Sequence, residues 1–307
     1  MTGLRPALAS YLDLRRSLGF KLDRDAKLLD QFITCLEERG TSAVTVTDAL
    51  AWAMPAGGSP GWLRMRMTVV RGFAACLATI DPSAEVPPAS LLPGGTHRAV
   101  PYLYSAADIA ALLAQAEKLK TPLRRATIKT LIGLMAVTGM RGGEVVALDD
   151  EDFDAGRGLL LVRRSKLGKH RLLPLHPTTV TAVQDYRHLR DQRFPRPVSE
   201  ALLVSSAGTR LLYYNVGITF ARLARRAGLA GRSGGSRPRP HDLRHSFAVA
   251  TLLDWCRDGG NIASRMPLLS AYLGHADPAG TYWYLHAAPE LLAEAARRLG
   301  ASPGERR

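Results

Sequence analysis

Apolar positions in the first 80 residues recur every three to four residues, which is the spacing of amphipathic helices. The pattern predicts four helices, each with its own start or stop residue. They run from Pro6 to Leu18, from Asp23 or Asp25 to Glu38, from a cap at Thr47 to Met54, and over 61–80. The first part of the chain is therefore expected to be a small helical domain.

A proline-rich break follows these helices. Residues 81–101 hold five prolines, at 82, 87, 88, 93 and 101, together with a Gly-Gly pair at 94 and 95. Such a composition is typical of a linker. We expect a helical domain at 1–80, a linker at 81–104 and a second domain at 105–307, in line with about 150 residues per domain.

The second domain shows mainly helical spacing, with one exception. Helices are predicted from Ser105, as N-cap, to Lys118 and over 122–138, 178–190, 213–227, 241–257, 267–273 and 289–299. The runs 159–163 and 170–175 are short and β-prone, and they flank Ser165–Lys169, which predicts a hairpin. The predicted fold class is mostly α with a small antiparallel β-sheet.

Composition narrows the cellular setting. The longest apolar run, 129–139, is much shorter than the ~20 residues of a membrane span, and the N-terminus lacks the pattern of a signal peptide. Three widely spaced cysteines without a CxxC pair argue against a disulfide framework and a cysteine zinc site. We expect no membrane partner and a reducing cytoplasm.

Charge points toward a polyanionic partner. Lys and Arg total 41 against 27 Asp and Glu, a net charge of +14. Nucleic acid is the first partner this suggests, although RNA-binding, ribosomal and membrane-surface proteins are also basic. The segment 210–244 holds eight arginines and a single acid, Asp242, and is either a phosphate-contacting region or a solvated face. The candidate DNA-contacting residues are Arg64, Arg66, Arg71, Arg222 and Arg239.

Two basic residues lie in segments suited to chemistry. Arg141 lies in Thr138-Gly-Met-Arg-Gly-Gly-Glu144, where the glycines let a backbone or phosphate come close to the guanidinium. A structural pair with Glu144 is the alternative. Lys166 lies in the predicted hairpin turn, either reaching into a groove or simply solvated.

The segment His241-Asp-Leu-Arg-His245 places His241, Arg244 and His245 on one helix face. Its spacing also resembles a zinc-binding HExxH motif with Asp242 in the place of the acid. Arg244 on the same face would repel the ion, and no further acidic ligand follows. Leu273-Gly-His275 marks a helix end, and Tyr284 follows in an aromatic cluster that alone would be ascribed to packing.

Taken in order, these segments resemble the tyrosine recombinases, or phage integrase family, over about residues 105–290. The resemblance implies that Arg141 and Arg244 are the catalytic arginines and Lys166 the catalytic lysine. It implies that His241 and His275 are the histidine positions, that Tyr284 is the nucleophile and that Glu144 is structural. The helical N-terminal half resembles the family's DNA-binding domain only in outline.

The chain departs from the family in the stretch between His275 and Tyr284, which is less rich in Ser and Thr. Tyr282 is therefore a rival nucleophile, and Lys169 a rival for Lys166. Residues two apart on a helix point to nearly opposite sides, so only one tyrosine serves the site. The spacing from His275 and the following Leu-His favour Tyr284.

The resemblance implies a site-specific recombinase that cuts and rejoins double-stranded DNA through a 3′-phosphotyrosyl intermediate, with no metal, cofactor or ATP. It also implies a homotetramer holding two DNA sites, in the cytoplasm with the nucleoid. A role in a mobile element is expected, with integration, transposition and resolution left open. A type IB-like topoisomerase, an inactive DNA-binding protein on the same fold and a zinc hydrolase are the alternatives.

Overall fold

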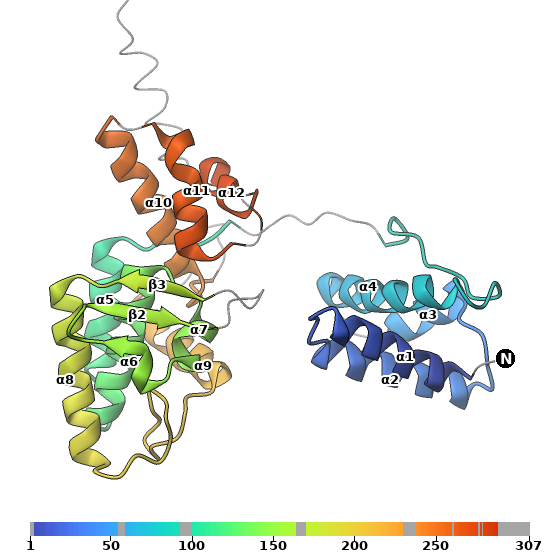
Figure 1. Ribbon diagram of the computed structural model, residues 1–307, viewed down its shortest axis with the longest axis horizontal. Helices are drawn as coiled ribbons and strands as arrows, with labels where there is room; N and C mark the ends of the chain where they lie inside the picture. Colours follow the sequence, from blue (N-terminus) through green and yellow to red (C-terminus); the bar gives the residue numbers. More distant parts are fainter. Residues whose placement is uncertain are drawn as a thin grey trace, which may run out of the picture. The chain divides into compact units, whose positions relative to one another are not determined.

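The computed structural model describes residues 3–54, 59–92, 100–163, 170–229, 237–259, 261–275, 277 and 279–287. Contacts divide the chain into a first unit, Met1–His97, and a second unit, Arg98–Arg307. The described part is mostly helical with one small antiparallel sheet, which confirms the predicted fold class (Figure 1). No described helix combines the length and the apolar composition needed to cross a membrane.

The first unit consists of α1 (Leu4–Ser17), α2 (Asp23–Glu38), α3 (Val46–Ala53) and α4 (Pro60–Leu77). Helix α4 packs against the other three around a core that includes Phe32 and Phe73. The predicted cap of the third helix is wrong by two residues. Thr45 has an extended backbone and its hydroxyl accepts from the Asp48 amide at 3.0 Å, whereas Thr47 lies inside the first turn.

Residues of the predicted linker pack on both units. Ala84, Leu91 and Leu92 contact the core of the first unit, and Tyr102 and Tyr104 belong to a core of the second. Arg71 in α4 donates from Nε and Nη2 to the carbonyls of Pro87 and Pro88, at 2.7 and 3.0 Å. The segment that follows α4 is therefore held against the first unit by these contacts.

The second unit is arranged around α6. Its helices are α5 (Ala106–Ala116), α6 (Pro122–Thr138), α7 (Gly142–Ala147), α8 (Pro177–Arg193), α9 (Tyr213–Arg226), α10 (Asp242–Arg257), α11 (Ile262–Leu273) and α12 (Ala279–Ala287). Helix α6 packs against α5, α7, α8 and α10 because apolar side chains cover several of its faces. The predicted helix at 289–299 lies outside the described residues.

The sheet confirms the predicted hairpin. Strands β1 (Phe153–Asp154), β2 (Leu159–Val162) and β3 (Arg171–Pro174) form an antiparallel sheet in that order. Leu160 pairs with Leu173, and both are buried. Strand β1, the 3₁₀ turn η1 (Asp150–Asp152) and helix α7 were not predicted, because they are too short to show a period.

The second unit has two apolar cores, joined by α10. Leu243 at the start of α10 belongs to the larger core, with α6 and the sheet. Leu252, further along, belongs to a smaller core with α11 and α12, which lie beside α10 in Figure 1. The start of α10 therefore lies where the two cores meet. Helix α11 begins at Ile262 rather than at 267, because Asn261 caps it.

Candidate active site

Two helix ends converge on one guanidinium. Helix α6 is capped by Gly139 (φ 61°) and α11 by Gly274 (φ 68°), both in the left-handed conformation that glycine adopts readily. Arg244 donates from Nη1 to the carbonyl of Gly139 at 2.9 Å and from Nη2 to that of Leu273 at 2.8 Å. Carbonyls at helix C-termini carry partial negative charge, so they stabilise the cation.

Arg244 is a buried cation without a described carboxylate partner. The residue is 1% exposed, and within the described part of the chain its side chain donates hydrogen bonds to the carbonyls of Gly139 and Leu273. Burial, and next the positive charge of Arg141, lower the pKa of Arg244 to about 10. Because a buried charge is costly unless compensated, this guanidinium favours an anion beside it.

Arg141 precedes α7 and is fixed from both sides. Its backbone amide and its Nη1 donate to the two carboxylate oxygens of Glu144, each at 2.9 Å. Its Nη2 donates to the carbonyl of Gly274 at 3.2 Å. The side chain keeps 30% of its surface exposed, so its other N–H groups remain accessible. The structural pair with Glu144 therefore coexists with a guanidinium open to solvent.

The glycines after Arg141 serve different purposes. A Cβ on Gly142 would lie 2.1 Å from Cε2 of Tyr213, so the ring of Tyr213 packs directly on this backbone. Beside Gly143 there is open space. Of the two positions where close approach was predicted, the first is filled by a side chain of α9, and the second remains open.

Arg171, on β3, is a residue of this region that the sequence reasoning missed. It donates from Nη1 and Nη2 to the two oxygens of Glu144, at 3.1 and 2.7 Å. Although burial raises the pKa of Glu144, the hydrogen bond from Arg171 and the nearby arginines bring it below its usual value. The available signal was strand alternation, since Arg171 lies two residues from the buried Leu173 and so faces the same side.

Tyr284 lies among histidine rings. Its ring centre is 5.4 Å from that of His245 and 6.1 Å from that of His275, with which it is stacked. The rings of His245 and His241 are 4.9 Å apart. His275 is fixed in turn by a 2.6 Å hydrogen bond between its Nδ1 and the hydroxyl of buried Thr281. Helix α12 thus brings Tyr284 to His275, one of the two predicted histidine positions, and to His245, whose ring lies beside His241, the other position.

The structure distinguishes the two candidate tyrosines. Tyr282 is 44% exposed, whereas Tyr284 is 2% exposed and belongs to the smaller core. Tyr284 also acts electrostatically on Arg244, whose pKa it raises. Arg141, Arg244, His241, His275 and Tyr284 are therefore drawn together, while the side chain of Tyr282 faces water.

His241 occupies the N-cap position of α10 and is surrounded by positive charge. Part of its surface faces solvent, yet withdrawal of the ring from water and the charges of Arg244 and Arg141 lower its pKa. Asp242 acts in the opposite direction. The ring is therefore largely neutral at pH 7 and able to accept a proton.

The zinc alternative finds little support. Within the described residues, no group of three or more His, Cys, Asp or Glu side chains could hold a metal ion. Asp242, which took the place of the acid in that motif, is buried and accepts from the backbone amide of Arg239 at 2.9 Å. Lys166 and Lys169 lie outside the described residues.

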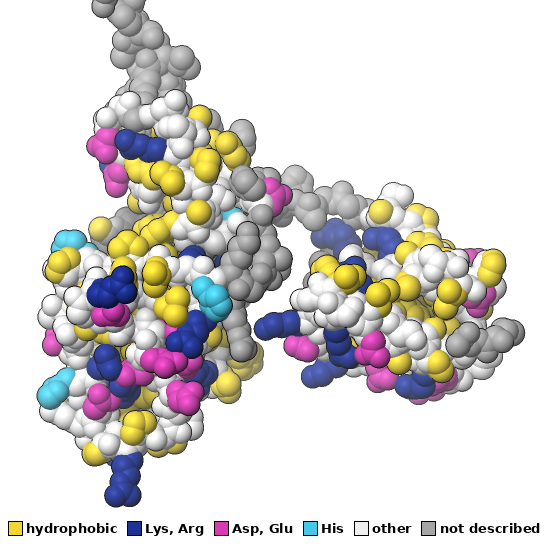
Figure 2. Space-filling view, in the orientation of Figure 1, with side chains coloured by type: hydrophobic (Ala, Val, Ile, Leu, Met, Phe, Trp, Pro, Cys, Tyr) yellow, Lys and Arg dark blue, Asp and Glu magenta, His cyan; other side chains and the backbone are white. Residues whose placement is uncertain are grey.

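The predicted DNA-contacting arginines differ in their surroundings. The guanidinium of Arg66 lies over the ring of Trp52, 3.7 Å from its centre, and that of Arg71 donates to the chain after α4. Arg222 is exposed, and the side chain of Arg239 is 51% exposed. On the face drawn in Figure 2, charges of both signs are intermixed over the second unit. Over the second unit, this face therefore shows no large area of positive charge alone.

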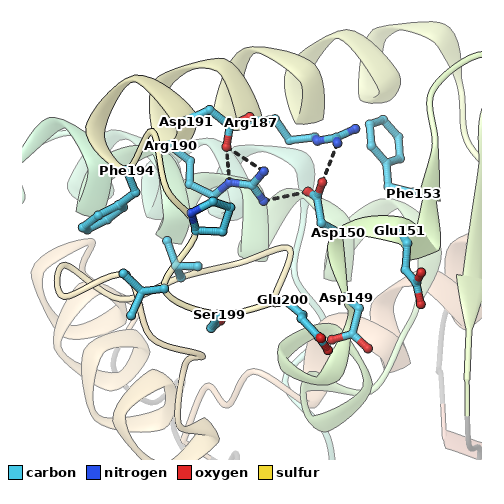
Figure 3. A pocket seen from close by; sticks show the side chains of 14 residues that line it. Asp149, Asp150, Glu151, Phe153, Arg187, Arg190, Asp191, Phe194, Ser199 and Glu200 are labelled. Carbon is cyan, nitrogen blue, oxygen red and sulfur yellow. Dashed lines mark hydrogen bonds and ion pairs between the residues drawn. The ribbon is translucent and has the colours of Figure 1, made fainter.

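One cavity, of about 660 Å³, lies apart from these residues. Its walls come from η1, α8 and the loop after α8, and two arginines of α8, Arg187 and Arg190, form ion pairs with acidic side chains of the lining (Figure 3). Arg190 binds Asp150 and Asp191, each at 2.7 Å. None of the predicted catalytic residues lines it.

Comparisons with known proteins agree with this geometry. Residues 104–290, more than half of the chain, match the model of the phage integrase family. The protein y4rB of Sinorhizobium fredii, whose name assigns it to the integrases and recombinases, is 40% identical over 308 residues, covering 97% of this chain and 98% of its own. The tyrosine recombinase XerC of Azotobacter vinelandii is 32% identical over 230 residues, covering 75% and 71%.

Solved structures share the fold. The Tn1549 transposon integrase in complex with circular intermediate DNA superimposes with a TM-score of 0.66 at 20% identity, covering 95% of this chain and 99% of that one. The XerH site-specific recombinase bound to a palindromic difH substrate gives 0.63 at 20% identity, covering 88% and 77%. The chain therefore belongs to the phage integrase family. It is a site-specific DNA recombinase of the tyrosine type.

Proposed function

We propose that this recombinase cuts double-stranded DNA with Tyr284 as nucleophile and Arg141 and Arg244 as phosphate-binding cations. The observation that carries the proposal is the surroundings of Arg244. A buried guanidinium, held by the carbonyls of Gly139 and Leu273, interacts electrostatically with both Tyr284 and Arg141. Glu144 acts on this cation only electrostatically, and a phosphodiester would supply an anion in direct contact with it.

The proposed cleavage reaction uses the positive charges of Arg141 and Arg244. The Tyr284 oxygen attacks the phosphorus, the bond to the 5′ oxygen breaks, and a 3′-phosphotyrosyl bond forms. In the transition state, negative charge grows on the nonbridging oxygens, and the two arginines stabilise it. Loss of one such donor typically costs about 3 kcal/mol of barrier.

Two proton transfers complete the step. His241, kept neutral by its lowered pKa, accepts the phenolic proton. Lys166 protonates the departing 5′ oxygen. In the reverse direction, the 5′ hydroxyl of a second strand attacks the phosphotyrosyl bond and releases Tyr284. The bond energy is conserved in the intermediate, so rejoining needs no ATP, and the arginines take the place of a metal ion.

A nicked suicide substrate tests this proposal. The nick lets the cleaved fragment diffuse away, so the covalent adduct accumulates. We expect an adduct with the unchanged protein in EDTA, an equal amount with Tyr282→Phe, and none with Tyr284→Phe. The reverse result for the two variants would move the nucleophile to Tyr282. If the unchanged protein and both variants bind the substrate but form no adduct, the protein binds DNA without cleaving it.

We also propose that four protomers hold two DNA sites, with the first unit contributing to DNA binding and the protein located with the nucleoid. Arg64, Arg222 and Arg239 are the proposed phosphate contacts. Arg66 and Arg71 have contacts inside the first unit, and the side chain of Arg239, which pairs with Asp242, is 51% exposed. The XerH recombinase and the Tn1549 transposon integrase, which share the fold, were solved bound to DNA, and this supports DNA as the partner. Sedimentation of the protein on DNA carrying two sites should give a mass of four protomers.

A further inference from the structure

The guanidinium of Arg171 lies behind Arg141, as seen from the accessible side of the site. Its side chain is 11% exposed and that of Glu144 is 9% exposed, against 30% for Arg141. Within the described residues its Nη atoms bind Glu144, and its buried Nε has no hydrogen-bond partner. Arg171 therefore turns toward protein, and not toward the surface where DNA would bind.

Glu144 is shared between the two arginines. Each of its carboxylate oxygens accepts one hydrogen bond from Arg171 and one from Arg141, whose donors are the backbone amide and Nη1. A carboxylate with a single arginine partner prefers a paired, two-pronged contact. Without Arg171, Glu144 would engage more N–H groups of Arg141, and these are the groups that a phosphate needs. Arg171 thus keeps Glu144 in its orientation and Arg141 partly unbound.

Arg171 also contacts the second support of Arg141. A Cβ on Gly274 would lie 2.8 Å from Nη1 of Arg171 and 3.1 Å from its Cζ, so the backbone at 274 rests on this guanidinium. The carbonyl of Gly274 accepts from Arg141, and the preceding carbonyl, of Leu273, accepts from Arg244. The Arg171 side chain therefore contacts both Glu144 and Gly274, the two groups that bind Arg141. It also lies next to the carbonyl of Leu273, which binds Arg244.

We propose that Arg171 is a positioning residue of the recombinase, which acts on the scissile phosphate through Glu144, Gly274 and Arg141 without touching DNA. This inference rests on the proposed role of Arg141. Because Arg171 pairs with Val162 at the end of β3 nearest the hairpin turn, the same contact ties the strand that follows Lys166 to the arginine site. Displacements of even about 1 Å at such sites lower reaction rates by around 100-fold.

The test is a double-mutant cycle on the full chain. Arg171→Met should lower the rate of adduct formation by about 10- to 100-fold, the range found for residues that orient a reacting group, while the affinity for DNA stays within about twofold of the unchanged protein's. In an Arg141→Ala background, Arg171→Met should cause little further loss, because its effect passes through Arg141. A full additional loss there would overturn the proposal. Arg171→Lys should recover part of the rate, and provides a variant in case the methionine variant does not fold.

Arg163→Met is the matched control. Arg163 follows β2 in the same hairpin but pairs with Glu151 and Asp152, so its loss should leave the adduct rate within about twofold. A second readout needs no activity: the backbone amide of Arg141, which donates to Glu144, should exchange its hydrogen faster in Arg171→Met. Unchanged exchange would refute the positioning role. Faster exchange together with no adduct from the unchanged protein would instead refute the proposed cleavage chemistry alone.

Discussion

Arg244 of α10 donates from Nη1 to the main-chain carbonyl of Gly139, 2.9 Å away and 105 positions earlier in the chain. Gly139 has φ 61°, and a Cβ there would lie 2.6 Å from Cδ1 of Phe247, one turn along α10 from Arg244. The lack of a side chain at 139 therefore lets α10 approach the end of α6 closely enough for the hydrogen bond. Packing and the position of the buried cation depend on the same glycine.

Gly139→Ala should destabilise the second unit and impair cleavage together. A left-handed conformation costs a residue with a Cβ about 1–2 kcal/mol, and the clash with Phe247 adds about 1–3 kcal/mol. We expect the free energy of unfolding, measured in urea, to fall by about 2–5 kcal/mol. The adduct rate at a temperature where the variant is folded should also fall, because the carbonyl that holds Arg244 moves.

Gly133→Ala in the same helix is the control. Nothing lies within 4 Å of a Cβ at this position, and alanine is the better helix former. The variant should gain about 0.5–1 kcal/mol of unfolding free energy and keep its cleavage rate. If both alanine variants lose stability equally, the close approach at Gly139 is not the cause.

Glu144→Gln should remove the anion that compensates two arginines. Breaking a buried pair from one side typically costs about 3–5 kcal/mol, so the unfolding free energy at pH 7 should fall by an amount of this order. Because the folded-state pKa of Glu144 is lowered, its contribution is present above the unfolded pKa and is lost as pH falls through the folded value. Urea unfolding should show a difference between the two proteins that is constant from pH 7 to 5 and shrinks below about pH 4. A difference unaffected by pH would mean that the carboxylate charge contributes nothing.

The His241 ring should titrate below its ordinary pKa of about 6.5. For a base with a lowered folded pKa, the unfolded state takes up the proton first, so stability falls as pH drops from above 6.5 through the folded value. Ring resonances followed by NMR, assigned with His241→Gln, should give the titration midpoint. Arg141→Gln should raise that midpoint, because a nearby positive charge is lost. Arg163→Gln should leave it unchanged.

Alanine variants of Arg71 and Arg222 should distinguish an arginine that stabilises the fold from one that contacts DNA. Arg71→Ala loses hydrogen bonds to two carbonyls and should lower the stability of the first unit by about 1–2 kcal/mol, with the salt dependence of DNA binding unchanged. Arg222→Ala should leave stability within about 0.5 kcal/mol and reduce the slope of log affinity against log salt by about 1. A reduced slope for Arg71→Ala would return that residue to the DNA interface.

The helices with long apolar periods, the hairpin and both glycine-capped helix ends could be predicted because each leaves a local pattern. The order of the arginine, lysine, histidine and tyrosine residues along the chain predicted the family correctly. The roles of the individual residues in catalysis remain proposals. Sequence alone could not choose firmly between Tyr282 and Tyr284, since the choice depends on which face of α12 meets α10. For Arg171, strand alternation indicates only that it faces the same side as Leu173, and not which groups it meets there. Its role depends on Glu144 and Gly274, which are brought to it only by folding.

The guanidinium of Arg244 is held by main-chain oxygens, which do not titrate. Its position therefore depends on the conformation of two helix ends rather than on the protonation state of an acidic side chain. Fraying of the last turn of either α6 or α11 would release the guanidinium while the remainder of the unit stays folded. On heating, the rate of adduct formation should thus fall some degrees below the melting temperature of the protein. This loss of activity should be fully reversible on cooling.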